Sequence, residues 1–350
     1  MINFRTDLAL ERRDLFKKAN NISNEVDGLE TQEESFTDDI KISRVKVLND
    51  NGEQAIGKRK GTYITIDIKN LKIAGEDEIQ KASEAVTKEL KNLIGALVDP
   101  QEDILVVGLG NLYVTPDALG PKVVNEIDIT RHLLNYMPDV LDKDTRPVSA
   151  IAPGVLGTTG IETKKLIEGV VNVSKPDFLI IIDALASSSI ERVNKTIQIT
   201  DVGIAPGSGV GNNREELNSK TFNIPTIAIG VPTIVDAVTI VSDTFKYMMR
   251  QFNYKLENLD NKKLKFVDEL HQNYLNEEGE LSFENREKIL GIVGTLKDDD
   301  LKKLIYEVLS PIDYNLMVTP KEIDFIMEKL SLLIANSINK VLHKSYNTTN

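Results

Sequence analysis

The chain has 350 residues, of which 41% are hydrophobic and 27% charged, as in globular proteins with room for one large domain or two ordinary ones. Its formal net charge of −12 disfavours direct binding to nucleic acid, and the absence of cysteine excludes thiol catalysis, disulfides and cysteine metal sites. No apolar run reaches the roughly 18 residues of a membrane span, and residues 1–7 lack the basic start and apolar core of a secretory signal. These features predict a cytoplasmic protein that does not bind a membrane.

Residues 1–40 are polar and acidic with little periodicity, and they predict an extended arm. Two alternating, β-branched runs follow at residues 45–48 and 62–68, and they predict half-buried strands that form a hairpin. Residues 75–98 carry apolar side chains at helical spacing. The predicted buried face of this helix comprises Ile79, Ala82, Val86, Leu90, Leu93 and Leu97.

From residue 104 onward, short apolar runs alternate with amphipathic ones, which is typical of repeated strand–helix units. The predicted strands are residues 104–107, 148–152, 178–182, 196–200 and 226–229, and the predicted helices are residues 116–135, 162–171 and 231–252. This alternation predicts an α/β fold with a mainly parallel sheet flanked by helices.

The C-terminal part of the chain has a different pattern. Residues 255–310 are charged, helix-forming and free of strand-like runs, so they predict a helical insertion or lid within a single α/β domain. Residues 320–344 predict an amphipathic closing helix. Its expected buried stripe consists of Ile323, Ile326, Met327, Leu330, Leu333 and Ile334.

Two aspartates are the strongest candidates for chemistry, because each follows an apolar run predicted to be a buried parallel strand. Asp117 lies in GLGNLYVTPDALGP (108–121), and Asp183 closes the run FLIII (178–182). Ligands gather at the carboxyl ends of such strands, where a carboxylate is placed for acid or base work. A helix cap at Asp183 and a first-turn acid at Asp117 are the structural alternatives, and residue types alone favour neither interpretation.

Other catalytic patterns are incomplete. Gly108 and Gly110 begin a dinucleotide-binding pattern, but Tyr113 replaces its third glycine, so a tight turn is favoured over NAD binding. The glycine-rich residues 203–211 lack the Gly-Lys-Ser/Thr ending of a P-loop. The serines at 187–189 have no evident histidine base. The only histidines, none of them in a catalytic context, are His132, His271 and His343.

A metal site stays open at this point. Asp117, Asp183 and Glu162 together offer the oxygen ligands that magnesium prefers. Metal-free acid catalysis needs fewer assumptions, and it uses the two aspartates alone. The sequence therefore predicts no metal and no cofactor.

Six segments, in order along nearly the whole chain, resemble the germination protease of endospore-forming bacteria. They are FRTDLALE (4–11), VVGLGNLYVTPDALGPKVV (106–124), SAIAPGVLGTTGIET (149–163), FLIIIDALASSSIERVNKTIQITDVGIAPGSGVGNNR (178–214), IPTIAIGVPTIVDA (224–237) and NLMVTPKEID (315–324). The resemblance implies an endopeptidase that degrades small acid-soluble spore proteins, works in the forespore and spore core, and forms a homotetramer. It also implies a fold related to that of hydrogenase-maturation endopeptidases.

The same resemblance assigns roles to particular residues. The two essential aspartates of the family fall on Asp117 and Asp183. Thr6-Asp7-Leu8-Ala9 looks like the family's substrate site, an acidic residue followed by a large apolar one and then alanine. The protein is thus expected to be a zymogen that cleaves itself between Asp7 and Leu8, with residues 1–7 as propeptide and residues 8–350 as the peptidase domain.

Our mechanistic hypothesis is that one aspartate activates a water molecule while the other acts as acid or electrostatic partner. Backbone amides in two glycine-containing loops are candidates for oxyanion or substrate contacts. These loops contribute Gly154, Gly157, Gly207 and Gly209. Three alternatives remain: a metal-dependent peptidase of the hydrogenase-maturation type, a nucleotide-dependent enzyme, and a non-enzymatic peptide-binding protein.

Overall fold

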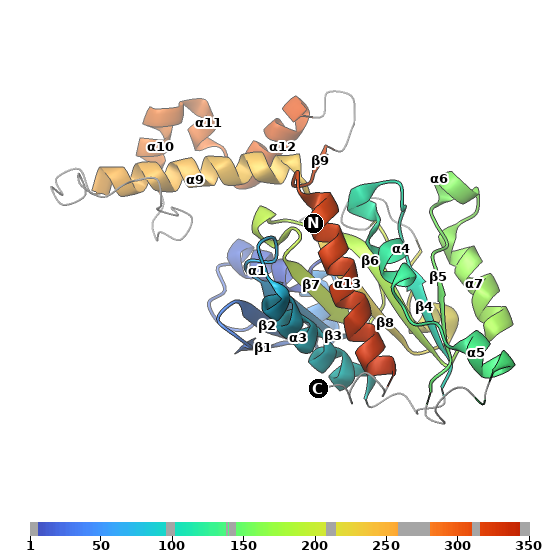
Figure 1. Ribbon diagram of the computed structural model, residues 1–350. Helices are drawn as coiled ribbons and strands as arrows, with labels where there is room; N and C mark the ends of the chain where they lie inside the picture. The colour runs from blue at the N-terminus through green and yellow to red at the C-terminus, as the bar shows by residue number, and fades with distance from the viewer. Residues whose placement is uncertain are drawn as a thin grey trace. The chain divides into compact units, whose positions relative to one another are not determined.

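The structure is a computed structural model (Figure 1). It describes residues 6–95, 102–137, 139, 145–207, 215–257, 281–309 and 316–343. The chain divides into two compact units, one formed by Met1–Ile234 with Thr319–Asn350 and the other by Val235–Val318. The second unit thus begins well before residue 255, where the sequence predicts the helical insertion to start.

The larger unit is built on a mixed sheet with the strand order β1-β2-β3-β7-β8-β6-β4-β5. The strands are β1 Leu29–Ser35, β2 Ile40–Val47, β3 Gly61–Ile68, β4 Ile104–Gly108, β5 Val148–Ile151, β6 Phe178–Ser187, β7 Thr196–Thr200 and β8 Thr226–Asp236. β4 pairs in parallel with β5 and β6, whereas every neighbouring pair from β1 to β8 is antiparallel. The predicted α/β fold, a mainly parallel sheet flanked by helices, is confirmed in its core of β4, β5 and β6, and antiparallel strands extend the sheet on one side.

Helices cover both faces of this sheet (Figure 1). One face packs against α3 Glu76–Ile94, α4 Leu119–Asn125 and α13 Ile323–Leu342, and the other against α7 Thr163–Ser174 and α8 Ser219–Phe222. The shorter helices are α2 Asp50–Ile56, η1 Thr115–Asp117, α5 Arg131–Tyr136, α6 Leu156–Thr159 and η3 Ile190–Arg192.

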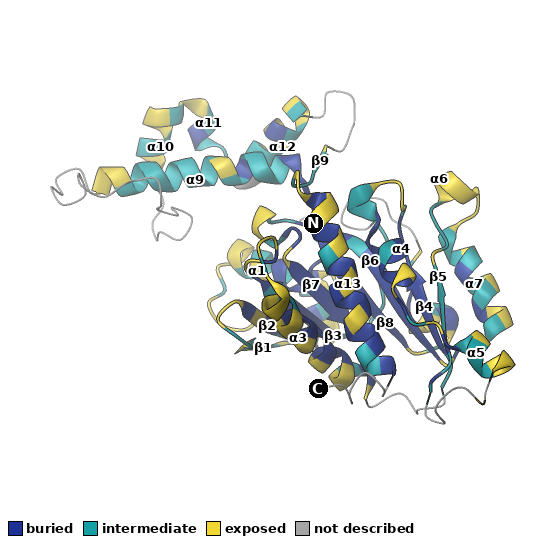
Figure 2. Ribbon diagram, in the orientation of Figure 1, coloured by how far each residue is buried: buried dark blue, intermediate teal, exposed yellow. Residues whose placement is uncertain are grey.

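β4 and the first half of β6 are buried on both faces (Figure 2). Along β4, Ile104 and Val106 belong to the core beneath α3, α4 and α13, while Leu105 and Val107 belong to the core beneath α7. A strand covered on both sides reads as a continuous apolar run. This is why the sequence identifies β4 and the first half of β6 so clearly.

The predicted extended arm is wrong for two stretches of residues 1–40, which form regular secondary structure. Ala9–Ala19 forms helix α1, and residues 29–35 form β1. Leu8, Ala9 and Leu10 are at most 3% exposed, and Ala9 and Leu10 join a separate core with residues of β2, β3 and α2. The helix escaped recognition because its buried residues all lie in its first turn, so no apolar stripe repeats along it.

Two strands are longer than predicted. β8 continues to Asp236, so residues 231–236 are strand rather than helix. β6 continues to Ser187, which places Asp183 inside the strand, although pairing with β4 stops at Gly108 and Ile182. The interpretation of Asp183 as a helix cap is therefore wrong.

α13 is the C-terminal helix of the larger unit, and it occupies most of the span predicted for the closing helix. All the residues of its predicted stripe are buried, and Met327, Leu330, Leu333 and Ile334 are 0% exposed. The helix packs most heavily against α3 and α4.

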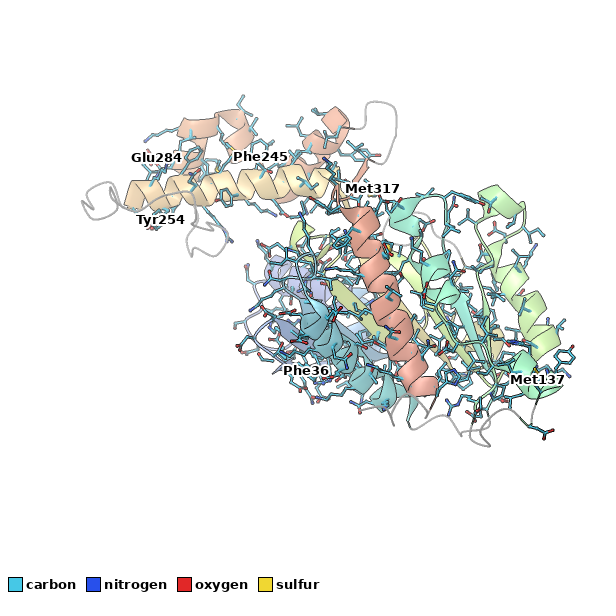
Figure 3. All side chains as sticks on the ribbon, viewed as in Figure 1. Phe36, Met137, Phe245, Tyr254, Glu284 and Met317 are labelled. Carbon is cyan, nitrogen blue, oxygen red and sulfur yellow. The ribbon has the colours of Figure 1, made fainter. Side chains whose placement is uncertain are left out.

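The smaller unit is mostly helical in its described residues. It contains α9 Ala237–Glu257, α10 Phe283–Leu290, α11 Ile292–Thr295 and α12 Asp298–Leu309, together with β9 Met317–Val318, which pairs with the end of β8. Figure 3 labels Phe245 and Tyr254 on α9 and Met317 on β9. Across the described residues of both units, no helix has the length and apolar character needed to span a membrane.

Leu330 and Leu332 allow a matched test of this packing, since both lie on α13 but only the first is buried, at 0% against 41% exposed. Replacing Leu330 by Ala should lower the free energy of unfolding by about 2–5 kcal/mol, because it removes buried methyl groups and leaves a cavity. Leu332→Ala should cost less than about 1 kcal/mol. Urea unfolding followed by circular dichroism measures both, and equal losses would contradict the assigned packing of α13.

Candidate active site

A cleft of about 660 Å³ in the larger unit is lined by both candidate aspartates. It lies at the carboxyl edge of the parallel strands, where the loops after β4 and β5 meet the second half of β6. The lining includes Asp7, Asp117, Asp183, Glu162, Gly154 and Gly207. Sequence positions more than a hundred residues apart thus share one acidic cleft.

Asp117 is held by the tight turn that follows β4. The backbone N–H of Asn111 donates to the Asp117 carbonyl at 3.0 Å and to its Oδ2 at 2.9 Å. Gly110 makes this possible, because its φ of +114° suits glycine and a Cβ there would lie 2.0 Å from the Asp117 carbonyl oxygen. The glycines of this motif therefore shape a turn that presents Asp117, which supports the tight-turn interpretation over NAD binding.

Asp183 occupies a different environment. It is 6% exposed and is the first residue of β6 beyond the pairing with β4. Its Oδ1 accepts a hydrogen bond from the N–H of Ala184 at 2.9 Å. Asp117 is only partly buried. Two carboxylates in unlike surroundings are suited to the separate roles of acid and base.

Asp7 of the N-terminal segment lines this cleft together with Asp117 and Asp183. The backbone N–H of Asp7 donates to the Ala186 carbonyl at 3.0 Å, and the Ala186 N–H donates to Oδ2 of Asp7 at 3.0 Å. Asp7 is 7% exposed, and the following Leu8 and Ala9 are fully buried. The segment is therefore docked against the second half of β6 rather than frayed.

The carboxylate of Glu11 fixes the N-terminal segment to the residues at the end of β6. It accepts hydrogen bonds from the Ser187 hydroxyl at 2.7 Å, from the Ser188 N–H at 2.7 Å and from the Ser188 hydroxyl at 2.8 Å. The hydroxyl of Thr6 donates to the same carboxylate. Both serines are thus structural donors here. Sequence reasoning missed Glu11, because one glutamate in a polar stretch carries no signal of burial.

Some of the other residues that the sequence suggested for the site line the cleft, and others do not. Gly154 and Gly207 line the cleft, whereas Gly157 is exposed and does not. Gly209 and His271 lie outside the described residues. His132 on α5 and His343 at the end of α13 do not line the cleft.

Glu162, the third carboxylate proposed for a metal, does line the cleft with Asp117 and Asp183. Within the described ranges, however, no group of three or more histidine or carboxylate side chains is placed to hold a metal ion.

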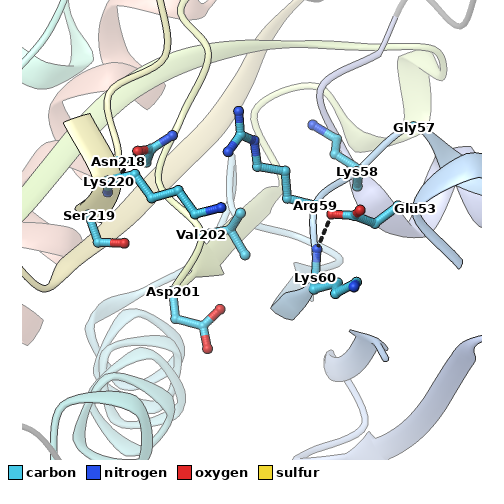
Figure 4. Close-up of a pocket in the computed structure, with 10 residues that line it drawn as sticks. All are labelled: Glu53, Gly57, Lys58, Arg59, Lys60, Asp201, Val202, Asn218, Ser219 and Lys220. Carbon is cyan, nitrogen blue, oxygen red and sulfur yellow. Dashed lines mark hydrogen bonds between the residues drawn. The ribbon is translucent and has the colours of Figure 1, made fainter. Parts of the chain in front are cut away.

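A second cleft, of about 520 Å³, opens between α2, the end of β7 and the start of α8 (Figure 4). It is lined by basic side chains, among them Lys58, Arg59, Lys60 and Lys220, together with the carboxylates of Glu53 and Asp201. Arg59 pairs with Glu216 at 2.5 Å, and Lys60 pairs with Asp50 at 2.6 Å.

Among the basic side chains of this second cleft, Lys58 has a strongly lowered pKa. Burial, and to a smaller extent the neighbouring Arg12, lower the pKa of its ammonium to about 8, against the opposing pull of Asp7 and Glu216. Arg12 in turn donates to the carbonyls of Thr6 and Gly57, at 2.9 and 3.1 Å. Residues 6 and 7 of the N-terminal segment therefore lie close to two cationic side chains, Arg12 and Lys58.

Taken together, two carboxylates at the edge of the parallel core and Asp7 of the N-terminal segment line one acidic cleft. The sequence model of the germination protease family matches residues 7–350. The chain belongs to the germination protease family, and it is accordingly a peptidase of the kind that acts in spore germination.

Curated relatives match over almost their entire length. The germination protease of Geobacillus sp. (strain WCH70) is 43% identical over 360 residues, covering 100% of this chain and 96% of the relative. That of Priestia megaterium is 44% identical, covering 99% and 95%. That of Clostridium acetobutylicum is 44% identical, covering 98% and 96%.

Among solved structures, a [NiFe] hydrogenase maturation protease, HycI from Thermococcus kodakarensis KOD1, matches 41% of this chain and 80% of that chain. The sequence identity is 17% and the TM-score is 0.27.

Gly110 and Gly157 offer a test of how Asp117 is presented. Gly110→Ala should move the Asp117 loop, because its Cβ would collide with the backbone of Asp117, and peptidase activity should fall at least about tenfold. Gly157→Ala meets no atom within 4 Å and should leave activity near that of the wild type. Steady-state cleavage of a peptide containing Thr-Asp-Leu-Ala compares the two variants, and an unimpaired Gly110→Ala enzyme would contradict the assigned turn.

The pKa of Lys58 predicts a pH-dependent stability. Because the pKa falls from 10.5 to about 8 on folding, the folded protein binds fewer protons than the unfolded chain between these values. The cost of burying Lys58 is therefore complete below about pH 8 and fades as the pH rises to 10.5. Lys58→Met should be more stable than the wild type at pH 7, and this gain should shrink by pH 10.

Denaturant unfolding of both proteins at the two pH values measures this gain. Lys220→Met serves as the control, since Lys220 lines the same cleft but is exposed. A gain for Lys58→Met that is identical at pH 7 and pH 10 would refute the assigned shift.

Proposed function

We propose that this protein is a self-processing endopeptidase in which Asp117 and Asp183 activate water, and that it cleaves its own chain between Asp7 and Leu8. One observation carries the proposal: Asp7 lines the same cleft as Asp117 and Asp183. Membership of the germination protease family supplies the peptidase class.

In the proposed reaction, one aspartate of the pair takes a proton from water, and the oxygen attacks the carbonyl carbon of Asp7. The bond from that carbon to the Leu8 nitrogen then breaks. Asp7 gains the hydroxyl and becomes a carboxylic acid, while the Leu8 nitrogen gains a proton and becomes the new amino terminus. The other aspartate supplies that proton or stabilises the developing charge.

The contacts of Asp7 support this as the cleaved position. Its carboxylate accepts from the Ala186 N–H, which favours an acidic side chain before the cleaved bond. Leu8 and Ala9 are fully buried, which favours a large apolar residue followed by a small one. These preferences match the Asp-Leu-Ala sequence that the chain itself carries.

The docked segment also accounts for a zymogen. While Asp7 lines the cleft and Leu8 and Ala9 stay buried, another chain cannot take their place, so removal of residues 1–7 is the step that begins to free it. We further propose, from family membership, that the substrates are small acid-soluble spore proteins and that the enzyme works as a homotetramer in the forespore and spore core.

Asparagine variants test the aspartate pair. Asp117→Asn and Asp183→Asn should each slow self-cleavage by at least about a hundredfold, because the amide cannot exchange a proton with water. Asp324→Asn, an exposed change on α13, should cleave itself like the wild type. Mass spectrometry of the full-length proteins over time, with and without a chelator, detects the loss of residues 1–7.

Several outcomes of this experiment would contradict the proposal. Full self-cleavage by either Asp117→Asn or Asp183→Asn would remove the aspartate pair from the mechanism. Loss of activity in chelator, restored by one divalent ion, would favour the metal-dependent peptidase instead. Cleavage at a bond other than that between Asp7 and Leu8 would overturn the assigned processing site.

A further inference from the structure

We propose that Gln198 clamps the substrate backbone on both sides of the cleaved bond and supplies a hydrogen-bond donor to the oxyanion formed there. This inference rests on the proposed function, since it takes the docked N-terminal segment as a bound substrate. It assigns an oxyanion donor on β7, in addition to the glycine loops considered above.

Both polar atoms of the Gln198 side chain contact the segment. Nε2 donates to the carbonyl oxygen of Asp7 at 3.4 Å, and Oε1 accepts from the N–H of Ala9 at 2.8 Å. The carbonyl of Asp7 is the one attacked in the proposed reaction. The side chain thus spans Leu8 and holds the peptide groups on either side of it.

The position of Gln198 is fixed by the sheet. It lies in the middle of β7, paired with Thr65 on β3 and Gly230 on β8, and it is 6% exposed. A donor mounted on a central strand is rigid, which is the requirement for an oxyanion site. The shorter contact to Ala9 fixes the orientation of the amide, because only Oε1 can accept from that N–H.

The hydrogen bond from Nε2 of Gln198 to the Asp7 carbonyl is the longer of the two, and we expect it to strengthen during the reaction. A donor at 3.4 Å interacts weakly with a neutral carbonyl. When the carbonyl carbon becomes tetrahedral and its oxygen gains negative charge, the same donor interacts far more strongly. An interaction that strengthens in the transition state accelerates the reaction, whereas one already complete in the ground state does not.

A purely structural role explains these contacts less well. In the part of the chain that the structure describes, both hydrogen bonds of the Gln198 side chain go to residues 7 and 9. This segment is the one whose first part is lost on processing. A buried amide that served the fold alone would lose its partner carbonyl at that moment, and unpaired buried groups are costly. The clamp also contacts only backbone atoms, so it does not depend on the side chains of the substrate.

The first test is Gln198→Met, which keeps the length of the side chain and removes both hydrogen bonds. With a peptide of residues 3–12 as substrate, kcat should fall about a hundredfold to a thousandfold, as for loss of one oxyanion donor. Thr65→Val is the matched control: it is buried beside Gln198, and no hydrogen bond to its hydroxyl is found among the described residues. This variant should keep the wild-type kcat, and thermal unfolding checks that both variants fold.

The second test changes the substrate instead of the enzyme. An ester in place of the amide between Leu8 and Ala9 removes the N–H group that donates a hydrogen bond to Oε1 of Gln198. Wild-type kcat/KM should fall about threefold to tenfold, the usual contribution of one hydrogen bond, while Gln198→Met should cleave both peptides alike. A role limited to folding would not produce this coupling, and the wild-type arm needs no variant to fold.

The outcomes separate this inference from the proposed function. If the wild type cleaves neither itself nor the peptide, the proposed function fails. If the wild type cleaves but Gln198→Met keeps kcat within about threefold, the oxyanion role is overturned. Equal cleavage of the amide and ester peptides by the wild type would overturn the clamp.

Discussion

The site depends on two hydrogen bonds between Asp7 and Ala186, one from the Asp7 N–H to the Ala186 carbonyl and one from the Ala186 N–H to the Asp7 carboxylate. β6 leaves its parallel partner β4 after Ile182, so its later backbone groups need new partners. Asp7 satisfies those of Ala186, and it lines the same cleft as Asp117 and Asp183. The same two hydrogen bonds therefore hold the N-terminal segment against β6 and place Asp7 in the wall of the cleft.

The parallel core and the aspartate motif were predictable, because their residues satisfy strong local constraints. β4 and β6 must be apolar on both faces, and Gly110 must be glycine where the turn approaches Asp117. Such constraints leave a signal in a single sequence. They identify the position of Asp117 even without a structure.

The N-terminal segment and its anchors could not be predicted in the same way. α1 buries only its first turn, so no repeating stripe marks it as a helix, and Glu11 is buried by hydroxyl donors from residues 187 and 188. Gln198 looks like any polar residue in an alternating strand, since its partners lie about 190 residues earlier in the chain. Contacts between distant segments give polar residues roles that leave no local pattern.

The proposed function places an unusual demand on the chain after cleavage. Leu8, Ala9 and Leu10 stay covalently attached, and Ala9 and Leu10 belong to a core with β2 and β3. A substrate clamped by Gln198 must take the place of Leu8 and Ala9, so the processed terminus has to leave it. Exposing a buried leucine costs about 1.5–3 kcal/mol, which makes the new terminus a competitor of the substrate. Loss of residues 1–7 removes the pairing of Asp7 with Ala186 and weakens that competitor. A short propeptide can therefore restrain the enzyme without a separate inhibitory domain, because the restraint comes from burial of the residues that follow it.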